Sequence, residues 1–410
     1  MKKKKVIIFL YNRFFDPLIQ SNFWLYINNF LNDPENPYEL QLITYEDKRF
    51  PLTEDQQKLV DGWIAKSLKW KKLYWHPGQG MVNKARDIIS GFFAVMGLRF
   101  KGYRHIVTLA SVAGSFGYMY AVILRMRLFL YQYEPHSEYA IDNKMWPANS
   151  KQFKISHYLE RKSAHFATVI ASGTRFMEER LKLEWKVKGA FVKISTVANQ
   201  DKFTFSQQDR DETRKRLGIS DDKWVLFYPG KFGDLYYREE TAFMYKWLQE
   251  LEPKLHFLIV TPHTDEEVKA LFDQAEVLPE YYTIAHSGYE DIHKYYTAAD
   301  FAVIAVPPGP SKKFISNIKV GEYLCAGLPF LITRGISEDY WYAENKNVGV
   351  VVDDFKEEYV KKAWPLMKEY FEMDKEKLRK HCREIGIDYR GFDKLNAQFR
   401  LAMSILVGKK

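Results

Sequence analysis

Short apolar runs alternate with longer polar or amphipathic segments along the first half of the chain. Runs of this length, rich in β-branched and aromatic residues, are typical of buried strands, and the segments between them are long enough for crossover helices. The predicted strands are 5–11, 39–45, 105–111, 127–133 and 167–173. This alternation predicts a parallel sheet that is covered on both faces.

The pattern is interrupted near residue 192, where VKISTVANQDKF resembles a last strand followed by a short polar connection. Domain boundaries fall in segments of this kind. A second alternating series follows, with strands predicted at 221–230, 256–262, 281–286, 301–306, 329–333 and 349–352, and helices at 238–251, 265–275, 292–300 and 316–327.

The end of the chain, residues 392–407, places Leu395, Phe399 and Met403 on one helical face. We therefore predict two doubly wound α/β domains, 1–195 and 196–385, with a helix in 386–410 that closes on them. Ligands of such folds bind at the carboxyl ends of the strands, and with two facing domains also in the central cleft.

One uncharged run, Ile106–Leu124, is 19 residues long, near the length of a membrane-spanning helix. Its composition changes at Ala-Gly-Ser-Phe-Gly, so we predict a buried strand, a glycine loop and then a helix, with a membrane-spanning helix as the alternative. The opening MKKKKVIIFLY has a short apolar run and no small-residue cleavage site, which favours a buried first strand over a signal peptide.

Charge is distributed unevenly along the chain, whose net charge is +9. Residues 1–195 carry 30 Lys and Arg against 17 Asp and Glu, whereas residues 196–410 carry 31 against 35. Residues 58–104 hold ten of these cations together with Trp63, Trp70 and Trp75. Cations interleaved with large aromatic side chains suit an anionic membrane surface, and a solvated basic face over a core helix is the alternative. No nucleic-acid-binding motif is present.

The two cysteines, Cys325 and Cys382, form neither a disulfide framework nor a zinc-binding pattern. We therefore expect a cytoplasmic protein without a metal site. The basic segment 58–104 would place it on the inner face of the cell membrane as a peripheral protein.

A glycine-rich loop, YPGKFGDLYYREE, lies between a predicted strand and a predicted helix at 228–240. Backbone N–H groups of a glycine turn can approach an anion, and a helix N-terminus adds partial positive charge. Gly230, Lys231, Gly233 and Arg238 could thus cradle a diphosphate, although a plain strand-to-helix turn with exposed cations would have the same sequence.

The segment SNIKVGEYLCAGLP, 316–329, places Lys319 and Glu322 one turn apart in an otherwise apolar helix. A lysine suits phosphate, and a carboxylate can accept hydrogen bonds from the vicinal hydroxyls of a ribose. A surface ion pair is the alternative interpretation.

These motifs resemble those of glycosyltransferases with the GT-B fold, family 4 (glycosyl transferases group 1). SNIKVGEYLCAGLPFLIT resembles the family signature P-x-K-x-x-E-Y-L-A-x-G-x-P-V-I, and GYEDIHKYYTAADFAVIAV and GISEDYWYAENKNVGVVV resemble its flanking segments. The match spans most of residues 220–355, and the first half matches only in its alternating architecture.

The resemblance implies that Lys319 contacts the donor diphosphate and Glu322 the ribose hydroxyls. It further implies that Lys231 and Arg238 lie near the phosphates and that Gly233 lies in the loop against the donor. The base would lie along Ser287–Ile292, which includes Gly288 and Ile292, and the donor sugar near Gly335 and Asp339.

Two positions depart from the family pattern. Phe314 occupies the place of a glutamate that often contacts the donor sugar, and Ser316 stands near the usual proline. The sequence therefore does not predict which sugar the donor carries.

On the acceptor side, YQYEPHSEY at 131–139 follows a predicted strand. Family members often carry a histidine in a loop of the first domain, which makes His136 the candidate catalytic residue there; Arg13 and Asp16 are weaker candidates. A structural histidine is the alternative.

The prediction is therefore a retaining, metal-independent glycosyltransferase with no cofactor besides its nucleoside diphosphate sugar donor. Lys319 and the loop cations would neutralise the leaving diphosphate. The basic first half suggests a lipid-linked or polysaccharide acceptor at the cytoplasmic membrane face. The alternatives are a sugar-nucleotide epimerase and a non-catalytic protein of the same fold that binds nucleotide sugars or polyanions.

Overall fold

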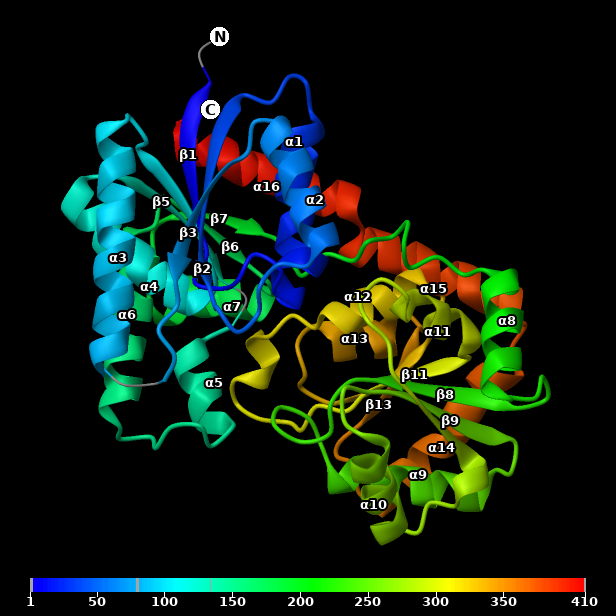
Figure 1. Cartoon of the computed structure of the whole chain (residues 1–410). Coiled ribbons are helices and arrows are strands. Elements are labelled where there is room, and N and C mark those ends of the chain that lie inside the picture. Colours follow the sequence, from blue (N-terminus) through cyan, green and yellow to red (C-terminus); the bar gives the residue numbers. More distant parts are fainter. Residues whose placement is uncertain (1–2, 79–80, 133, 409–410) are drawn as a thin grey trace. The chain divides into compact units, whose positions relative to one another are not determined.

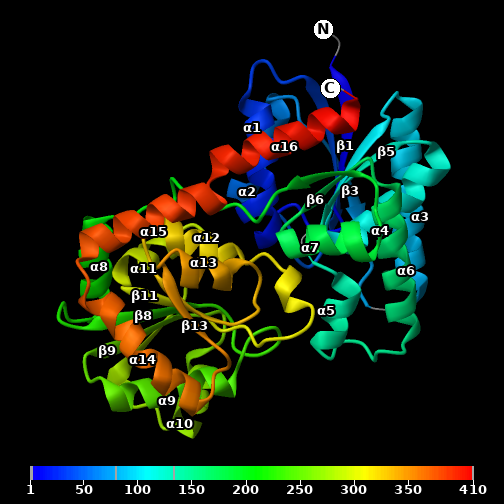
Figure 2. The same ribbon diagram turned by 180° about the vertical axis from the view of Figure 1, so that it is seen from behind.

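The chain folds into two compact units in a computed structural model that describes residues 3–78, 81–132 and 134–408 (Figures 1 and 2). The first unit comprises Met1–Ser195 and Leu395–Lys410, and the second comprises Thr196–Lys394. Tyr133, in the predicted strand 127–133, and residues 79–80, in the basic segment 58–104, lie outside the described residues.

The first unit is built on a parallel sheet of seven strands. Its order is β3 (Lys69–Tyr74), β2 (Tyr38–Glu46), β1 (Lys4–Phe9), β4 (His105–Leu109), β5 (Arg127–Gln132), β6 (Val169–Ser172) and β7 (Ala190–Lys193). The order reverses direction at β1, as in a doubly wound fold, because the chain returns from β3 to pair β4 with β1.

Helices cover this sheet and connect its strands (Figure 1). They are η1 (Ile19–Phe23), α1 (Trp24–Asn32), α2 (Glu54–Ala65), α3 (Met81–Phe100), α4 (Ala110–Leu124), α5 (His136–Asp142), α6 (Lys151–Phe166), α7 (Arg175–Glu179), η2 (Arg180–Glu184) and α16 (Phe392–Val407). Phe399 of α16 stacks on Tyr26 of α1 with ring centroids 4.6 Å apart, and Arg400 pairs with Asp33. The last helix thus packs on the first unit, and residues 386–390 of the predicted closing segment belong to the preceding helix instead.

The second unit repeats the doubly wound arrangement with six parallel strands. Their order is β10 (Tyr282–Ala285), β9 (Leu255–Val260), β8 (Trp224–Pro229), β11 (Phe301–Ile304), β12 (Phe330–Thr333) and β13 (Gly349–Val352). The helices are α8 (Gln207–Leu217), α9 (Glu239–Leu251), α10 (Asp265–Gln274), η3 (Pro279–Tyr281), α11 (Ile292–Ala298), η4 (Lys312–Phe314), α12 (Ile318–Cys325), α13 (Asp339–Asn345), α14 (Glu357–Glu372) and α15 (Lys375–Arg390).

The prediction of a glycine loop after β4 is wrong. Helix α4 begins at Ala110, directly after the strand, and Gly114 and Gly117 lie inside it. A Cβ on Gly117 would come within 2.4 Å of Thr108 Cγ2 on β4. These glycines therefore serve close helix-to-sheet packing and not a turn. In the described part of the chain, no helix combines the length and the apolarity needed to cross a membrane.

A buried carboxylate anchors the short helix α5 to α6. Glu160 of α6 accepts hydrogen bonds from the backbone N–H of Ser137 at 2.9 Å and from its hydroxyl at 2.7 Å. Burial raises the pKa of Glu160 to about 7, although the bonds from Ser137 and the nearby His136 oppose this shift. Glu160 therefore fixes the start of the helix on which His136 lies.

The close approach of α4 to the sheet predicts opposite effects for two helical glycines. Gly117→Ala should lower the free energy of unfolding by about 1–2 kcal/mol, because the added methyl collides with the buried Thr108. Gly97→Ala in α3 is the matched control, since its Cβ meets nothing within 4 Å and should raise stability by up to about 1 kcal/mol. Urea denaturation of both variants measures the difference; equal effects would contradict the packing explanation.

The raised pKa of Glu160 predicts a pH-dependent stability. The folded state holds this proton more tightly than the unfolded state, so the contribution is fully present below the unfolded pKa of about 4.5 and is lost as the pH rises through about 7. Glu160→Gln keeps an acceptor for Ser137 but cannot ionise. Its melting temperature should therefore fall less than that of the wild type between pH 5 and pH 8. Parallel melting curves for the two proteins over this range would argue against a buried, titrating Glu160.

Candidate active site

The carboxyl ends of three neighbouring strands of the second unit meet at one edge of its sheet. The register pairs Pro229 of β8 with Val260 of β9, and Val260 with Ala285 of β10. These ends lie beside the point where the strand order reverses, between β8 and β11, which is where open α/β sheets bind ligands.

A pocket of about 620 Å³ opens at this edge. It is lined by strand-end residues and by residues of α11 and α12, namely Pro229, Gly230, Val260, Thr261, Pro262, His286, Ser287, Gly288, Tyr289, Ile292, Tyr296, Lys319 and Glu322. Five residues predicted from the sequence thus come together, although they lie in three separate parts of the chain: Gly230, Gly288, Ile292, Lys319 and Glu322.

Lys319 lies against Gly230, the residue directly after β8. A Cβ on Gly230 would lie 2.5 Å from Lys319 Nζ, so a side chain at position 230 would displace the ammonium group. The same Nζ lies over the ring of Tyr236 at 4.3 Å from its centroid. Among the described residues, no carboxylate lies within ion-pair distance of Lys319. Its charge is therefore held on aromatic faces, at the mouth of the loop predicted to bind phosphate.

Glu322 is a buried carboxylate, with 7% of its surface exposed. One oxygen accepts a hydrogen bond from the Tyr296 hydroxyl at 2.6 Å, and the other has no partner within the described parts of the chain. Burial raises the pKa of Glu322, while the Tyr296 bond and the cations Lys319 and Lys202 oppose the shift. The two charged residues of α12 are thus not a surface ion pair, and each presents a polar group to the pocket.

The loop after β8 is only partly at the pocket. Gly233 has a φ of +84°, a left-handed conformation that favours glycine, and its carbonyl accepts a bond from Tyr236 N–H. Lys231 and Arg238 are exposed, do not line the pocket, and Arg238 pairs with its neighbour Glu239 at 3.1 Å. Their contact with phosphates stays a prediction.

Asp339 is enclosed in a buried network. Its carboxylate accepts bonds from Arg390 at 2.5 Å, from Tyr389 at 2.9 Å and from Asn317 at 2.9 Å, and neither Asp339 nor Arg390 has exposed side-chain surface. The structure therefore holds this carboxylate in an internal network, and its position near a donor sugar stays a prediction. Gly335, with a φ of +81°, has no atom within 4 Å of an added Cβ.

Phe314 and Ser316, the two positions that depart from the family pattern, both have structural contacts within the second unit. Phe314 is buried in η4 with 4% exposure, so that position offers no carboxylate. Ser316 Oγ accepts bonds from Thr196 N–H at 3.0 Å and from Arg390 at 2.6 Å, which ties the start of α12 to both chain segments that lead toward the first unit.

Lys202 is a residue of this region that the sequence analysis missed. Its ammonium group lies over the Tyr289 ring at 4.1 Å from the centroid, and it lowers the pKa of Glu322. It precedes α8 in an irregular segment with no motif. No local sequence signal could have placed it beside Tyr289, 87 residues away.

In the first unit, the carboxyl edge of the sheet carries His136, the first residue of α5. Burial alone would lower its pKa, but Glu134, with an oxygen 3.5 Å from Nδ1, together with Glu160 raises it above the ordinary value. Asp16 caps its own loop by accepting a bond from Leu18 N–H at 2.9 Å, and Arg13 stacks on Phe50. A catalytic position for His136 stays a prediction.

The same edge holds a second polar cluster that the sequence did not reveal. Asp87 of α3 is fully buried and accepts hydrogen bonds from the Tyr11 hydroxyl and from His76, whose Nδ1 lies 2.6 Å away. Lys84 donates to the Tyr11 hydroxyl at 2.9 Å. Their spacing in sequence matches no motif, so only the fold brings them together. Among the described residues, no group of three or more His, Cys, Asp or Glu is arranged to hold a metal.

Comparison with known proteins identifies the fold. No family model matches the chain, and no curated protein matches its sequence. Among solved structures, sucrose-phosphate synthase from Thermosynechococcus elongatus is similar over 99% of both chains, with 14% identity and a TM-score of 0.74. HepE from Anabaena, in complex with UDP and glucose, is similar over 98% of this chain and 99% of its own, with 12% identity and a TM-score of 0.69.

A third similar structure is WaaG, a glycosyltransferase involved in lipopolysaccharide biosynthesis, which covers 98% of this chain and 100% of its own at 13% identity and a TM-score of 0.65. Since both units, their strand orders and the neighbouring structures agree, the predicted fold class is confirmed: the chain has the GT-B fold, with two Rossmann-like domains.

Proposed function

We propose that the protein is a retaining, metal-independent glycosyltransferase that moves a sugar from a nucleoside diphosphate sugar to a saccharide or lipid-linked acceptor at the cytoplasmic face of a membrane. The observation that carries this proposal is the pocket at the strand ends of the second unit. Among the described residues, Lys319 has no ion-pair partner there, and the buried carboxylate of Glu322 has one oxygen without a hydrogen-bond partner.

The two charged residues suit the two parts of a nucleoside diphosphate. Lys319, held against Gly230, would contact the diphosphate and neutralise the negative charge that develops as the glycosidic bond to phosphate breaks. Glu322, fixed by Tyr296, would accept hydrogen bonds from ribose hydroxyls. Gly288 and Ile292 would lie beside the base. Retention of configuration rests on the family resemblance alone.

The similar structures support this assignment. HepE was solved with UDP and glucose, which makes UDP the first nucleotide to test here. WaaG is described as acting in lipopolysaccharide biosynthesis, which supports a lipid-linked acceptor.

A non-catalytic binding protein is the second candidate, and the buried Phe314 favours it because this position supplies no carboxylate to a donor sugar. Transfer or hydrolysis of a donor by the wild type, lost in Lys319→Ala, would exclude it. An epimerase would instead yield a new sugar nucleotide with no acceptor present.

The pocket predicts that the two charged residues bind different parts of the nucleotide. By calorimetry against UDP, GDP, ADP, CMP and TDP, one diphosphate should bind, and Lys319→Ala should weaken it about tenfold or more while affecting the nucleoside little, because a charged hydrogen bond is lost. Glu322→Gln should weaken the ribonucleotide severalfold but leave the 2′,3′-dideoxy form unchanged.

Lys269→Ala, an exposed lysine on α10, is the matched control and should bind as the wild type does. Wild-type affinity in both pocket variants, or no binding of any nucleotide, would refute the donor site.

A further inference from the structure

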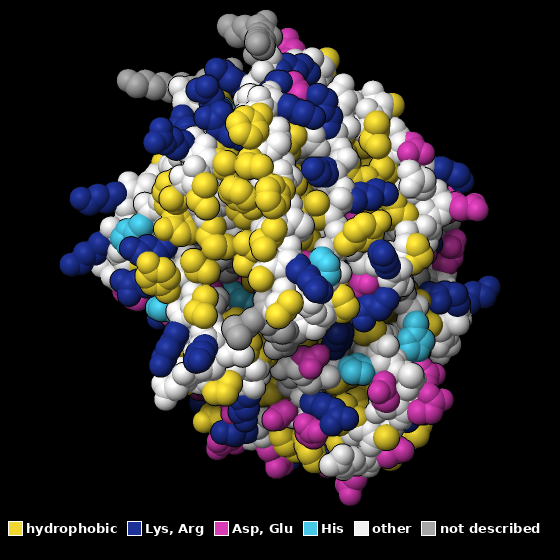
Figure 3. Space-filling view, turned by 60° about the vertical axis from the view of Figure 1, so that its left-hand side comes forward, with side chains coloured by type: hydrophobic (Ala, Val, Ile, Leu, Met, Phe, Trp, Pro, Cys, Tyr) yellow, Lys and Arg dark blue, Asp and Glu magenta, His cyan; other side chains and the backbone are white. Residues whose placement is uncertain are grey.

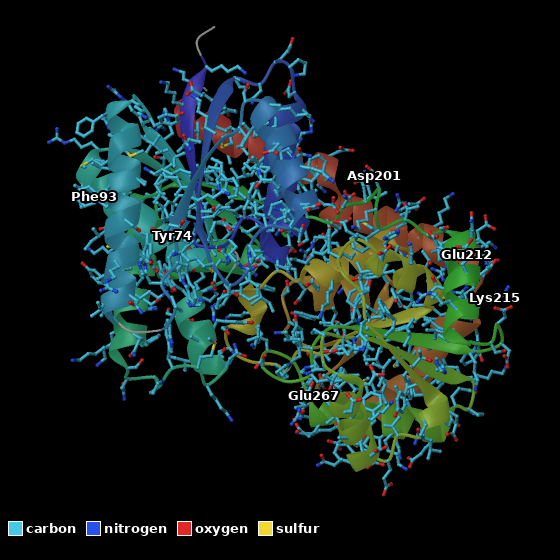
Figure 4. The ribbon with its side chains drawn as sticks, viewed as in Figure 1. Tyr74, Phe93, Asp201, Glu212, Lys215 and Glu267 are labelled. Atoms are coloured by element: carbon cyan, nitrogen blue, oxygen red, sulfur yellow. The ribbon has the colours of Figure 1, made fainter. Side chains whose placement is uncertain are left out.

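Helix α3 is apolar on two opposite sides, and only one of them is covered. Its inner side, which includes Ala94, Val95 and Leu98, is buried against the sheet and neighbouring helices. Its outer side carries an apolar stripe at helical spacing, formed by Val82, Ile89, Phe93 and Phe100, which are 66%, 54%, 59% and 82% exposed. Phe93 projects outward from α3 (Figure 4).

The stripe continues across two adjacent helices. Helix α4 packs against both α3 and α6, and the three helices lie side by side in Figures 1 and 2. Further exposed apolar side chains come from α4 and α6, namely Val122, Ile123, Ile155, Tyr158 and Phe166. Figure 3, turned so that the left-hand side of Figure 1 comes forward, shows a broad area of hydrophobic side chains with Lys and Arg around it. We call this surface the α3–α4–α6 face. An exposed apolar area of this breadth marks an interaction site.

All exposed charge on these three helices is positive. Their only acidic residues are Asp87 and Glu160, with 0% and 1% of their surface exposed. Both carboxylates are engaged inside the unit, with His76 and Ser137 respectively. The exposed cations on or directly after the helices are Arg86, Lys101, Arg125, Lys151, Lys154, Arg161 and Lys162.

The cations of α6 also line a shallow hollow of about 410 Å³. Lys154, Arg161 and Lys162 lie around it with Tyr158, so that cationic groups stand beside exposed apolar surface. Such a hollow suits a phosphate-bearing group attached to an apolar body.

We propose that the α3–α4–α6 face docks on an anionic lipid bilayer, with the apolar stripe at the level of the headgroups and the cations on the lipid phosphates. The charge complementarity decides the occupant: a face of apolar side chains with cations and no exposed acid matches an anionic interface. A second copy of the chain would set like charges against each other, which disfavours self-association.

The structure also changes the surface predicted from residues 58–104. Trp63 and Trp70 pack against Phe14, with ring centroids 5.3 and 5.0 Å away, and are therefore half-buried in an aromatic cluster of the first unit. Lys69, Lys71 and Lys72 lie on the edge strand β3, where lysines protect an unpaired edge. Only α3 of that segment contributes to the face, together with α4 and α6 from outside it.

Co-sedimentation of the full chain with vesicles tests this proposal. The protein should bind vesicles of phosphatidylcholine and phosphatidylglycerol, bind phosphatidylcholine alone far more weakly, and dissociate as salt is raised. The charge variant Arg86→Glu/Arg161→Glu/Lys162→Glu should lower the partition coefficient by about a hundredfold or more, because each basic residue contributes about fivefold near an anionic surface. Ile89→Ser/Phe93→Ser should lower it by about tenfold or more.

Matched controls come from exposed residues of the second unit. Lys215→Glu/Lys269→Glu/Lys377→Glu and Leu278→Ser/Leu366→Ser should bind as the wild type does, since all five side chains are exposed outside the face. Equal binding by face and control variants, or equal binding to neutral vesicles, overturns the proposal. Self-association without vesicles that Ile89→Ser/Phe93→Ser abolishes would instead assign the face to a second copy.

This proposal rests on the proposed function only in one respect: a membrane-bound acceptor would explain why the protein binds a membrane. Vesicle binding needs no nucleotide, and the face variants should retain the nucleotide affinity of the wild type. A failure of docking is thereby distinguishable from a failure of the donor site.

Discussion

The buried ion pair between Arg390 and Asp339 is the interaction on which the pocket depends. Neither side chain is exposed, and Arg390 also donates to the Thr196 and Ser316 hydroxyls. Burial alone would lower the pKa of Arg390, but Tyr389 and Asp339 raise it above its ordinary value, so the guanidinium stays charged. Removing one partner of such a pair leaves an uncompensated buried charge, at about 3–5 kcal/mol. Because α12 begins two residues after Ser316, the pair fixes the helix that carries Lys319 and Glu322, the two residues proposed to bind the donor.

Two opposite charges on this helix do not neutralise each other, because each side chain has its own partner in the pocket. Glu322 is held by Tyr296, and Lys319 lies on Tyr236 beside Gly230. These contacts of the two side chains, and not the helix backbone that carries both, keep the ammonium group and the carboxylate from pairing with each other. A site that holds charged groups without charged partners is less stable than it could be, which is typical of a surface preorganised for a ligand.

The sequence predicted the parts of this molecule that depend on local pattern. Alternating apolar runs indicated both parallel sheets, and the spacing of Lys319 and Glu322 placed them at one pocket. It could not show β3, whose lysines hide an edge strand, nor that Gly117 serves packing and not a turn. The resemblance around Asp339 is local, so it could not show the hydrogen bond from Arg390, which lies 51 residues away. Contacts between distant segments decided each of these points.

The surface charge of the α3–α4–α6 face likewise could not be predicted from the sequence alone. Counted along the sequence, the acids of α3 and α6 offset part of the positive charge, and the apolar residues of α3 suggest a core helix. Folding separates these contributions. Asp87 and Glu160 are turned inward to hydrogen-bond partners, so that only cations remain outside, and one sheet can cover only one side of a helix that is apolar on two. An acid that is buried against an internal hydrogen-bond donor contributes little to the charge of the surface. The exposed side of the α3–α4–α6 face is therefore more basic and more apolar than the composition indicates. Both properties favour the proposed binding to an anionic bilayer.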